Sequence, residues 1–254
     1  MEQITIGLFG FGKTGSIVAQ EIIKDESLCL SWVIRKSEVN QGEYVSRLLG
    51  FHQDEGILYS AQHIDFETFF ENNKVDVIID FSDLSSVGEY QSAVNQGIRI
   101  VSAISNYDDS NFEQLIKISK ETAVLYSPNI TLGINFLIEA SKLFKKVAPN
   151  ADIEIIEEHF REKKSVSGTA VRIAQDLGVN SDEHVKSIRA GGVVGTHEVI
   201  FGLPNQIIRI KHESLSRAAF GQGAIYAAKW IMNKEKGMYS MEEAISSLLE
   251  KAVI

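Results

Sequence analysis

Three glycines near the start of the chain have the spacing of a nucleotide-binding loop. Gly10, Gly12 and Gly15 follow the apolar run ITIGLF and match the pattern G-x-G-x-x-G. In such loops the first glycine permits a tight turn, the second lets the backbone approach a pyrophosphate, and the third allows close packing of helix against strand. The amino terminus of the following helix then faces the anion. The predicted dinucleotide contacts of this loop are Gly10, Phe11, Gly12, Lys13, Thr14 and Gly15.

The same segment also fits the phosphate loop G-x-x-x-x-G-K-T of NTPases, starting at Gly7. In that interpretation Lys13 contacts phosphates and Thr14 binds magnesium, while Asp80 is a metal-binding acid at the end of a strand. It shortens the first strand to ITI, however, and leaves several apolar residues in a loop. The dinucleotide interpretation is therefore favoured, with a P-loop NTPase and a purely structural turn as the alternatives.

Two cations stand where many NAD-binding folds carry an acid for the ribose hydroxyl, about 20 residues after the glycine loop. They are Arg35 and Lys36. Arg35 can bind the 2′-phosphate of NADPH through paired hydrogen bonds, and Lys36 can add a more flexible charge. An ordinary solvated turn is the alternative. We therefore expect NADPH to bind at least as well as NADH, with both cofactors used.

A second segment with reactive side chains lies in the other half of the chain, where residues 157–170 read EEHFREKKSVSGTA. His159 can exchange a proton near neutral pH, and Lys163 can supply positive charge or a proton. Hydroxyls and backbone amides at a helix start can bind a carboxylate. An exposed charged turn followed by a helix cap is the alternative interpretation. The predicted contacts to a small anionic substrate are Ser167, Gly168 and Thr169.

The elements that position these residues change in type along the chain. Up to about residue 128, short runs rich in Val and Ile alternate with segments of helical periodicity, which predicts an α/β fold with a parallel sheet. Because the runs are apolar at most positions, helices are expected on both faces of the sheet. The predicted strands are 4–9, 28–34, 75–81, 98–104 and 123–127, and the predicted helices are 13–24, 85–96 and 111–120, with Ser85 or Ser110 as end caps.

Beyond Pro128 the pattern predicts a second architecture, an α+β portion whose mostly antiparallel sheet has helices on one face. A final amphipathic helix is expected at about 240–249. The predicted fold is therefore a Rossmann-like dinucleotide-binding domain joined to a substrate domain. In the second portion, the predicted helix spans 135–147 and the predicted strands are 151–160, 184–190, 192–202 and 205–213.

Composition narrows the classes of function. The 254 residues carry 25 Lys and Arg against 34 Asp and Glu, a net charge of −9, which argues against a general binder of nucleic acid or anionic membranes. Cys29 is the only cysteine, so no disulfide within the chain and no cysteine-based zinc site are expected, and no metal site is predicted. The chain shows neither a signal-peptide pattern nor 18 consecutive apolar residues, so we expect a cytoplasmic protein.

Six motifs occur in one order along nearly the whole chain: GFGKTG, VIIDFS, SPNITLGIN, EEHFREKKSVSGTA, IRAGGVVGTHEVIF and SRAAFGQGA. In this order the chain resembles the dihydrodipicolinate reductase family. The resemblance implies reduction of the dicarboxylate 4-hydroxy-tetrahydrodipicolinate to tetrahydrodipicolinate by NADPH or NADH, in lysine and diaminopimelate biosynthesis. It also implies a homotetramer, with a dinucleotide-binding domain at 1–129 completed by 232–254, and a substrate-binding and oligomerisation domain at 130–231.

The same resemblance assigns roles to single residues. His159 and Lys163 fall at the family's two acid–base positions. Three departures concern the substrate: Phe160 replaces the family's second histidine, the K-x-D-x-P-S-G-T passage is one residue shorter, and the G-T-T-G-F loop reads AISNY at 103–107. A reductase of another cyclic imino or oxo acid is therefore the alternative. The residues that the resemblance adds to the expected cofactor site are Ala103, Ser105, Ser127 and Asn129.

Overall fold

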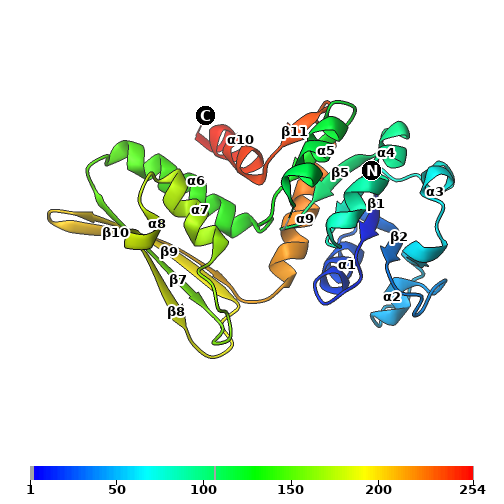
Figure 1. Cartoon of the computed structure of the whole chain (residues 1–254), viewed down its shortest axis with the longest axis horizontal. Helices are drawn as coiled ribbons and strands as arrows, with labels where there is room; N and C mark the ends of the chain where they lie inside the picture. Colours follow the sequence, from blue (N-terminus) through cyan, green and yellow to red (C-terminus); the bar gives the residue numbers. More distant parts are fainter. Residues whose placement is uncertain (1–2, 106, 254) are drawn as a thin grey trace. The chain divides into compact units, whose positions relative to one another are not determined.

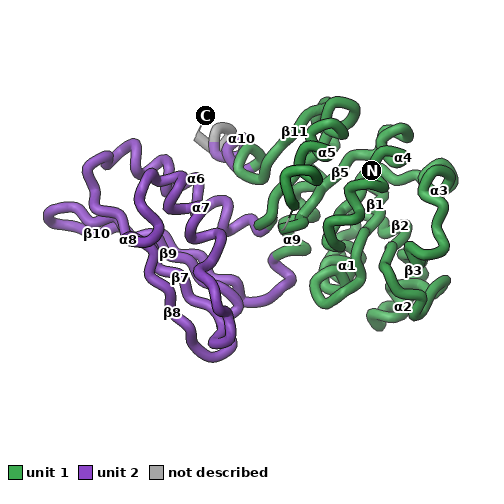
Figure 2. Tube along the Cα trace, viewed as in Figure 1, with its two compact units in different colours: residues 1–130, 220–244 green, residues 131–219, 245–254 purple. Residues whose placement is uncertain are grey.

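The computed structural model of the chain describes residues 3–105 and 107–253, without the side chains of 250–253. It divides into two compact units, coloured green and purple in Figure 2. Unit 1 extends to Ile130 and resumes from Phe220 to Ala244, and unit 2 runs from Thr131 to Ala219 and resumes at Ile245. Among the described residues, no helix is long and apolar enough to cross a membrane.

The return of the chain to unit 1 begins at helix α9 (Ala218–Ile231), for which the sequence analysis predicts no helix. The return thus lies before residue 232, and the end of the chain from Ile245 belongs to unit 2. Helix α9 belongs to unit 1 because it packs closely against α1 (Gly15–Lys24). A Cβ on Gly221 of α9 would lie 2.9 Å from the side chain of Glu21. An ion pair of 2.7 Å between Lys229 Nζ and Asp25 Oδ2 adds to this contact.

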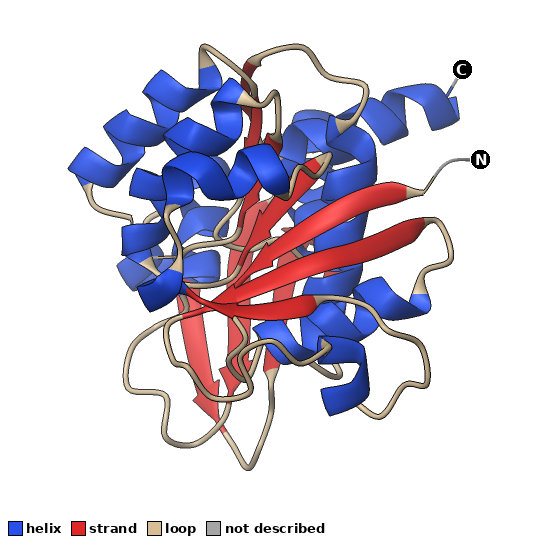
Figure 3. Cartoon of the chain, turned by 90° about the vertical axis from the view of Figure 1, so that its right-hand side faces the viewer, coloured by secondary structure: helices blue, strands red, loops and turns tan. Residues whose placement is uncertain are grey.

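Seven parallel strands form the sheet of unit 1, in the order β11-β6-β5-β4-β1-β2-β3 (red in Figure 3). All five strands predicted in this half are present, and β3 and β11 complete the sheet. Every residue of β4 is buried, as expected for a strand covered on both faces. The strands are β1 (Ile4–Phe9), β2 (Leu28–Arg35), β3 (Ile57–Ser60), β4 (Val77–Asp80), β5 (Arg99–Ser102), β6 (Ala123–Tyr126) and β11 (Gly237–Tyr239).

The helices of unit 1 include two whose starts differ from the prediction. Asp83, not Ser85, caps η2, because the Asp83 carboxylate accepts a hydrogen bond from the backbone N–H of Ser85. Asp108 caps α5 in the same way, and Ser110 lies inside that helix. Besides α1 and α9 they are α2 (Val45–Leu48), η1 (Ala61–His63), α3 (Phe66–Asn72), η2 (Leu84–Glu89), α4 (Tyr90–Asn95) and α5 (Asp109–Ser119).

The strand order of unit 1 reverses at β1. The chain builds β2 and β3 on one side of β1 and then crosses to β4, β5 and β6 on the other side. In open parallel sheets a ligand crevice forms beyond the carboxyl ends of the strands at such a point. The glycine loop follows β1 directly and therefore lies at this crevice.

Unit 2 has a four-stranded sheet in the order β10-β9-β7-β8, in which β7–β9 and β9–β10 are antiparallel and β7–β8 is parallel. Helices α6 and α7 cover one face, and their buried Ile134, Leu137 and Ile173 form a core with Ile155 and Phe201 of the sheet (Figure 1). The predicted helix and strands are thus confirmed. The elements are α6 (Leu132–Val147), β7 (Asp152–His159), α7 (Gly168–Asp176), α8 (Ser181–His184), β8 (Val185–Arg189), β9 (Gly195–Leu203) and β10 (Gln206–Ser214), and the terminal helix α10 is Met241–Val253.

Candidate active site

The apolar face of the unit 2 sheet becomes polar at one end. Strand register places Ser187, Glu157, His197 and His212 next to one another across β8, β7, β9 and β10. A row of this kind on a helix-covered face needs partners, because buried polar groups without hydrogen bonds are costly. The partners come from the same strand ends and from the start of α7.

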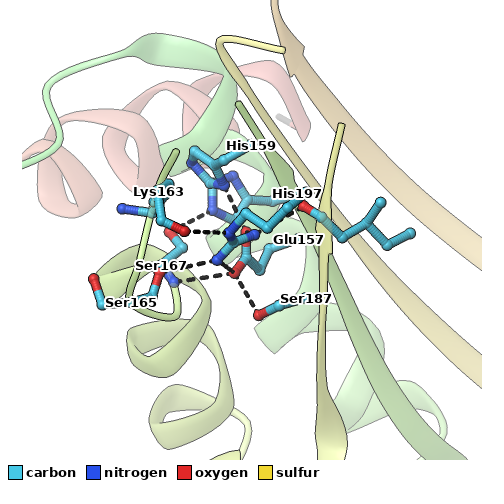
Figure 4. Close-up of polar contacts among 9 residues, drawn as sticks. Glu157, His159, Lys163, Ser165, Ser167, Ser187 and His197 are labelled. Carbon is cyan, nitrogen blue, oxygen red and sulfur yellow. Dashed lines mark hydrogen bonds and ion pairs between the residues drawn. The ribbon is translucent and has the colours of Figure 1, made fainter. Parts of the chain in front are cut away.

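Glu157 lies at the centre of this row, with a fully buried side chain (Figure 4). Arg189 binds it through two hydrogen bonds, from Nη2 to Oε1 at 2.6 Å and from Nη1 to Oε2 at 2.9 Å. Ser187 Oγ donates to Oε1 at 2.6 Å, and the backbone N–H of Ser167 donates at 3.2 Å. Burial disfavours the charge, but hydrogen bonds from Arg189, Ser187 and His159 outweigh it and lower the pKa of Glu157 to about 2.

The ionised Glu157 determines how His159 is protonated. Nδ1 of His159 lies 2.5 Å from Glu157 Oε2, and a carboxylate only accepts hydrogen bonds, so Nδ1 carries the proton. The tautomer with its proton on Nδ1 has a lone pair at Nε2, the atom that can take up and release a proton. Gly195 of β9 leaves room for this ring, because a Cβ there would lie 3.1 Å from Nε2. With 12% of its side chain exposed, His159 is held yet reachable.

A second histidine, His197, supports the loop beside His159. Its Nε2 lies 2.8 Å from Ser167 Oγ, and its ring meets that of His159 edge to face with centroids 5.4 Å apart. Burial, followed by the nearby His159, lowers the pKa of His197 to about 4, so the imidazole is neutral at neutral pH. His197 is thus a hydrogen-bonding partner rather than a positive charge.

The predicted substrate contacts meet at the start of α7. Ser167 is the residue that precedes the helix, and its hydroxyl binds His197 instead of capping the helix. Gly168 and Thr169 are the first helical residues, at the end where backbone N–H groups face anions. A Cβ on Gly168 would meet no atom within 4 Å, so the space beside this residue is open. The geometry at this turn suits a carboxylate.

Lys163 lies on the loop between β7 and α7, on the same loop as Ser165 and Ser167 (Figure 4). Arg189, which binds Glu157, also binds this loop. Its Nε donates a hydrogen bond to the backbone oxygen of Lys163 and its Nη2 donates one to the backbone oxygen of Ser165, each at 2.9 Å. Phe160, at the position of the family's second histidine, is 41% exposed.

No role is predicted from the sequence for Glu157, Ser187, Arg189 or His197. Two of them carried a detectable signal: Glu157 alternates with Ile153 and Ile155 on the buried face of β7, and a charged residue at such a position needs a partner. His197 interrupts the buried side of β9 in the same way. The identity of their partners depends on strand pairing, which the sequence alone does not reveal.

Unit 1 holds a pocket of about 430 Å³ at the crevice beyond β1, β2 and β4, here called the β1–β2–β4 pocket. Arg35 lies beside the Phe11 ring, with its guanidinium carbon 5.9 Å from the ring centroid. Ser37 Oγ is buried in the pocket wall without a hydrogen-bond partner among the described residues. The predicted cofactor residues in its lining are Gly10, Phe11, Gly12, Arg35 and Lys36.

The glycine loop fits a dinucleotide. Gly10 has a φ of 97°, and a Cβ there would lie 2.7 Å from the backbone oxygen of Phe81. A Cβ on Gly15 would lie 2.1 Å from the oxygen of Gly10, so α1 packs closely against the turn. Gly12 has open space in front of it, as a residue that a pyrophosphate approaches would require. The loop, the two cations and the unpartnered Ser37 hydroxyl together suit a dinucleotide.

The remaining predicted cofactor residues do not line this pocket. Thr14, Ala103 and Ser105 line a neighbouring cavity of about 310 Å³ that shares Phe81 and Ser82 with it. Lys13 is exposed, Gly15 begins α1, and Asn106 of the 103–107 loop lies outside the described residues. Ser127 is buried and donates its hydroxyl hydrogen bond to the backbone oxygen of Asn129 at 2.8 Å, just after β6.

The phosphate-loop alternative does not fit this structure. Gly7 lies inside β1, paired with Ile78, and a Cβ there would lie 2.2 Å from the ring of Trp32. Asp80 is fully buried and accepts hydrogen bonds from Ser86 and Tyr90. Burial raises the pKa of Asp80 despite these bonds, so the carboxyl is neither exposed nor poised to bind magnesium.

Two family models cover the chain. The model described as dihydrodipicolinate reductase, N-terminus, matches residues 4–130, and the one described as dihydrodipicolinate reductase, C-terminus, matches residues 130–245. The 4-hydroxy-tetrahydrodipicolinate reductase of Rickettsia bellii (strain OSU 85-389) is 34% identical over 68% of this chain and 77% of that protein. The reductase of the same name from Wolinella succinogenes is 30% identical over 94% of this chain and 98% of its own length.

Solved structures show the same fold at lower identity. Dihydrodipicolinate reductase from Paenisporosarcina sp. TG-14, bound to dipicolinate, aligns with a TM-score of 0.77 at 20% identity, over 95% of this chain and 99% of that one. An amine dehydrogenase from Mycobacterium smegmatis aligns with a TM-score of 0.63 at 11% identity, over 92% of this chain and 94% of that one.

Proposed function

The chain belongs to the dihydrodipicolinate reductase family, and we propose that the Glu157–His159 pair and the start of α7 carry out its reaction on a small dicarboxylate. The protein is an oxidoreductase that reduces 4-hydroxy-tetrahydrodipicolinate with NADPH or NADH, in lysine and diaminopimelate biosynthesis. When bound, the reduced nicotinamide supplies the hydride. The β1–β2–β4 pocket with Gly10, Gly12, Arg35 and Lys36 would hold the cofactor.

The chain's own residues then have three tasks in unit 2. His159 exchanges at Nε2 the proton that hydride addition requires, while Glu157 keeps the other proton at Nδ1. Lys163 supplies positive charge, and it is the second candidate for the proton donor. The backbone amides at Gly168 and Thr169, with the Ser167 hydroxyl held by His197, receive a substrate carboxylate.

One observation carries this proposal, the 2.5 Å contact of His159 Nδ1 with a Glu157 carboxylate that also binds the N–H of Ser167. A single buried carboxylate thus fixes both the proton-exchanging group and the anion-binding turn. The test is consumption of NADPH by the purified protein with enzymatically generated 4-hydroxy-tetrahydrodipicolinate. Absence of turnover under conditions where a known reductase is active would contradict the proposal. Complementation of a diaminopimelate-requiring strain by the gene for this protein would support it.

One feature favours a different substrate as the second candidate. This feature is the exposed Phe160 ring, which stands in place of the family's second histidine. A histidine hydrogen bond to an anion is worth about 1.5–3 kcal/mol, or about one to two decades in affinity. A divergent reductase of another cyclic imino or oxo acid would tolerate its loss. A panel of such acids, assayed with NADPH, separates this candidate from the first.

We also propose a cytoplasmic homotetramer. The sheet face opposite α6 and α7 leaves Ile207 of β10 60% exposed and Ile188 of β8 44% exposed, and both strands are edges of the sheet. A second sheet packed on this face would cover them. Light scattering coupled to gel filtration measures the state, and a monomer at micromolar concentration would contradict it.

A further inference from the structure

An acidic residue from a different strand end stands beside the two cations of the β1–β2–β4 pocket. Asp83 lies in the turn after β4 and lines the same pocket as Arg35 and Lys36. Its Oδ2 lies 2.7 Å from Lys36 Nζ. The crossover from β3 to β4 thus brings a carboxylate beside the cations that follow β2, where dinucleotide folds commonly hold the ribose.

Hydrogen bonds within its own turn orient the Asp83 carboxylate. Its Oδ1 accepts hydrogen bonds from Ser85, from the backbone N–H at 3.0 Å and from the hydroxyl at 2.7 Å. Burial disfavours its charge, but the hydrogen bonds from Lys36 and Ser85 together outweigh that effect and lower the pKa of Asp83 to about 2. The carboxylate is therefore ionised at neutral pH, and a bound cofactor meets a fixed negative charge.

The charges of the pocket act differently on the two cofactors. A 2′-phosphate is attracted by Arg35 and Lys36 but repelled by the Asp83 carboxylate, which also occupies Lys36. A ribose 2′-hydroxyl has no charge to be repelled, and it can donate a hydrogen bond to a carboxylate. The same pocket therefore contains a group suited to each cofactor.

We propose that Asp83 sets the cofactor preference, by accepting a hydrogen bond from the ribose 2′-hydroxyl of NADH and opposing the binding of the NADPH 2′-phosphate to Lys36. The inference rests on the proposed cofactor site of unit 1. The protein consequently uses both cofactors, and removal of this one carboxylate makes it NADPH-selective.

The test measures binding, not turnover, with Asp83→Asn, which keeps a side chain that caps helices well. NADPH and NADH are titrated by fluorescence, and adenosine 2′,5′-bisphosphate and AMP by calorimetry. We expect about two- to fivefold tighter binding of the two 2′-phosphorylated ligands and about two- to fivefold weaker binding of the other two. This range corresponds to an exposed charge pair of up to about 1 kcal/mol, at about 1.4 kcal/mol per decade.

Two further variants keep the test decisive. Asp83→Ser retains a capping hydroxyl without the carboxylate and should reproduce the shift. Asp54→Asn removes the same charge from another exposed ion pair, that with Arg47 at 2.6 Å outside the pocket, and should change neither ligand class. If the Asp83 variants are folded and their affinities for ligands with and without a 2′-phosphate change equally, or do not change, the inference is overturned. A wild-type protein that binds neither NADPH nor NADH overturns the proposed cofactor site itself, and the inference with it.

Discussion

The two sites of the molecule are built in different ways. The β1–β2–β4 pocket depends on the glycine loop, whose main contacts are with its own neighbours in the chain and with the adjacent turn after β4. The polar row of unit 2 depends on side chains from four strands, and its central buried carboxylate is held by partners from β7, β8 and the start of α7. The pocket is therefore sensitive to backbone space at single glycines, whereas the polar row is sensitive to the loss of any charged partner.

The largest expected effect is on turnover, in variants of the polar row. His159→Gln keeps a polar side chain but removes proton exchange, so kcat should fall about 10²–10⁴-fold. Lys163→Ala should lower kcat strongly and also raise the KM of the substrate if the charge holds a carboxylate. The affinity for NADPH, measured by fluorescence, should stay nearly unchanged in both variants, because the pocket belongs to unit 1. Near-normal turnover in folded variants would remove both residues from the catalytic assignment.

A matched pair of glycine variants tests whether backbone space in the glycine loop controls folding and dinucleotide binding. Gly15→Ala places a Cβ 2.1 Å from a backbone oxygen, so it should destabilise unit 1 by about 1–3 kcal/mol or more and reduce dinucleotide binding. Gly12→Ala meets no atom within 4 Å and should fold normally, yet lose affinity for NADPH because the methyl group fills the approach to the pyrophosphate. Urea unfolding and NADPH titration separate the two. Unchanged NADPH affinity in Gly12→Ala would contradict the placement of the pyrophosphate.

Loss of Arg189 tests whether the polar row behaves as a single unit. Arg189→Ala leaves the buried Glu157 charge without its main partner, which should cost about 2–3 kcal/mol of stability. This is less than for a fully buried pair because 20% of the Arg189 side chain is exposed. The loop carrying Lys163 should loosen as well. In the double variant Arg189→Ala/Glu157→Gln, part of the stability should return but not the activity. If the double variant is no more stable than Arg189→Ala, the unpaired charge of Glu157 is not the cause of the destabilisation.

A smaller effect, on binding alone, is expected from the cations of the pocket. Replacing Arg35 and Lys36 together by Ala should weaken NADPH by about tenfold, because a 2′-phosphate loses two charge-assisted contacts. NADH should change less, since it carries no phosphate there. Dissociation constants for the two cofactors measure the difference. Equal losses would show that these cations do not recognise the phosphate.

Much of the fold could be predicted because its signals are local. Apolar runs of strand length and the helical period identified β1, β2, β4, β5 and β6 of the parallel sheet and the four strands of the second sheet. The segment at 40–62 has no clear strand or helix pattern in the sequence, and it contains only α2, β3 and the start of η1, all of them short. Helix α9 was missed because its Gly- and Ala-rich surface gives a weak pattern, and its stability comes from close packing against α1.

The sequence by itself determined the glycine loop, the cations after β2 and the His159–Lys163 loop, because each is a property of neighbouring residues. Only the tertiary structure decided what these groups meet. Arg189 and Ser187 reach Glu157 through strand pairing, His197 reaches Ser167 across the sheet, and Asp83 reaches Lys36 across the reversal of strand order. These partners are far apart in the chain, and their contacts depend on strand register and sheet order, which packing of the whole fold selects.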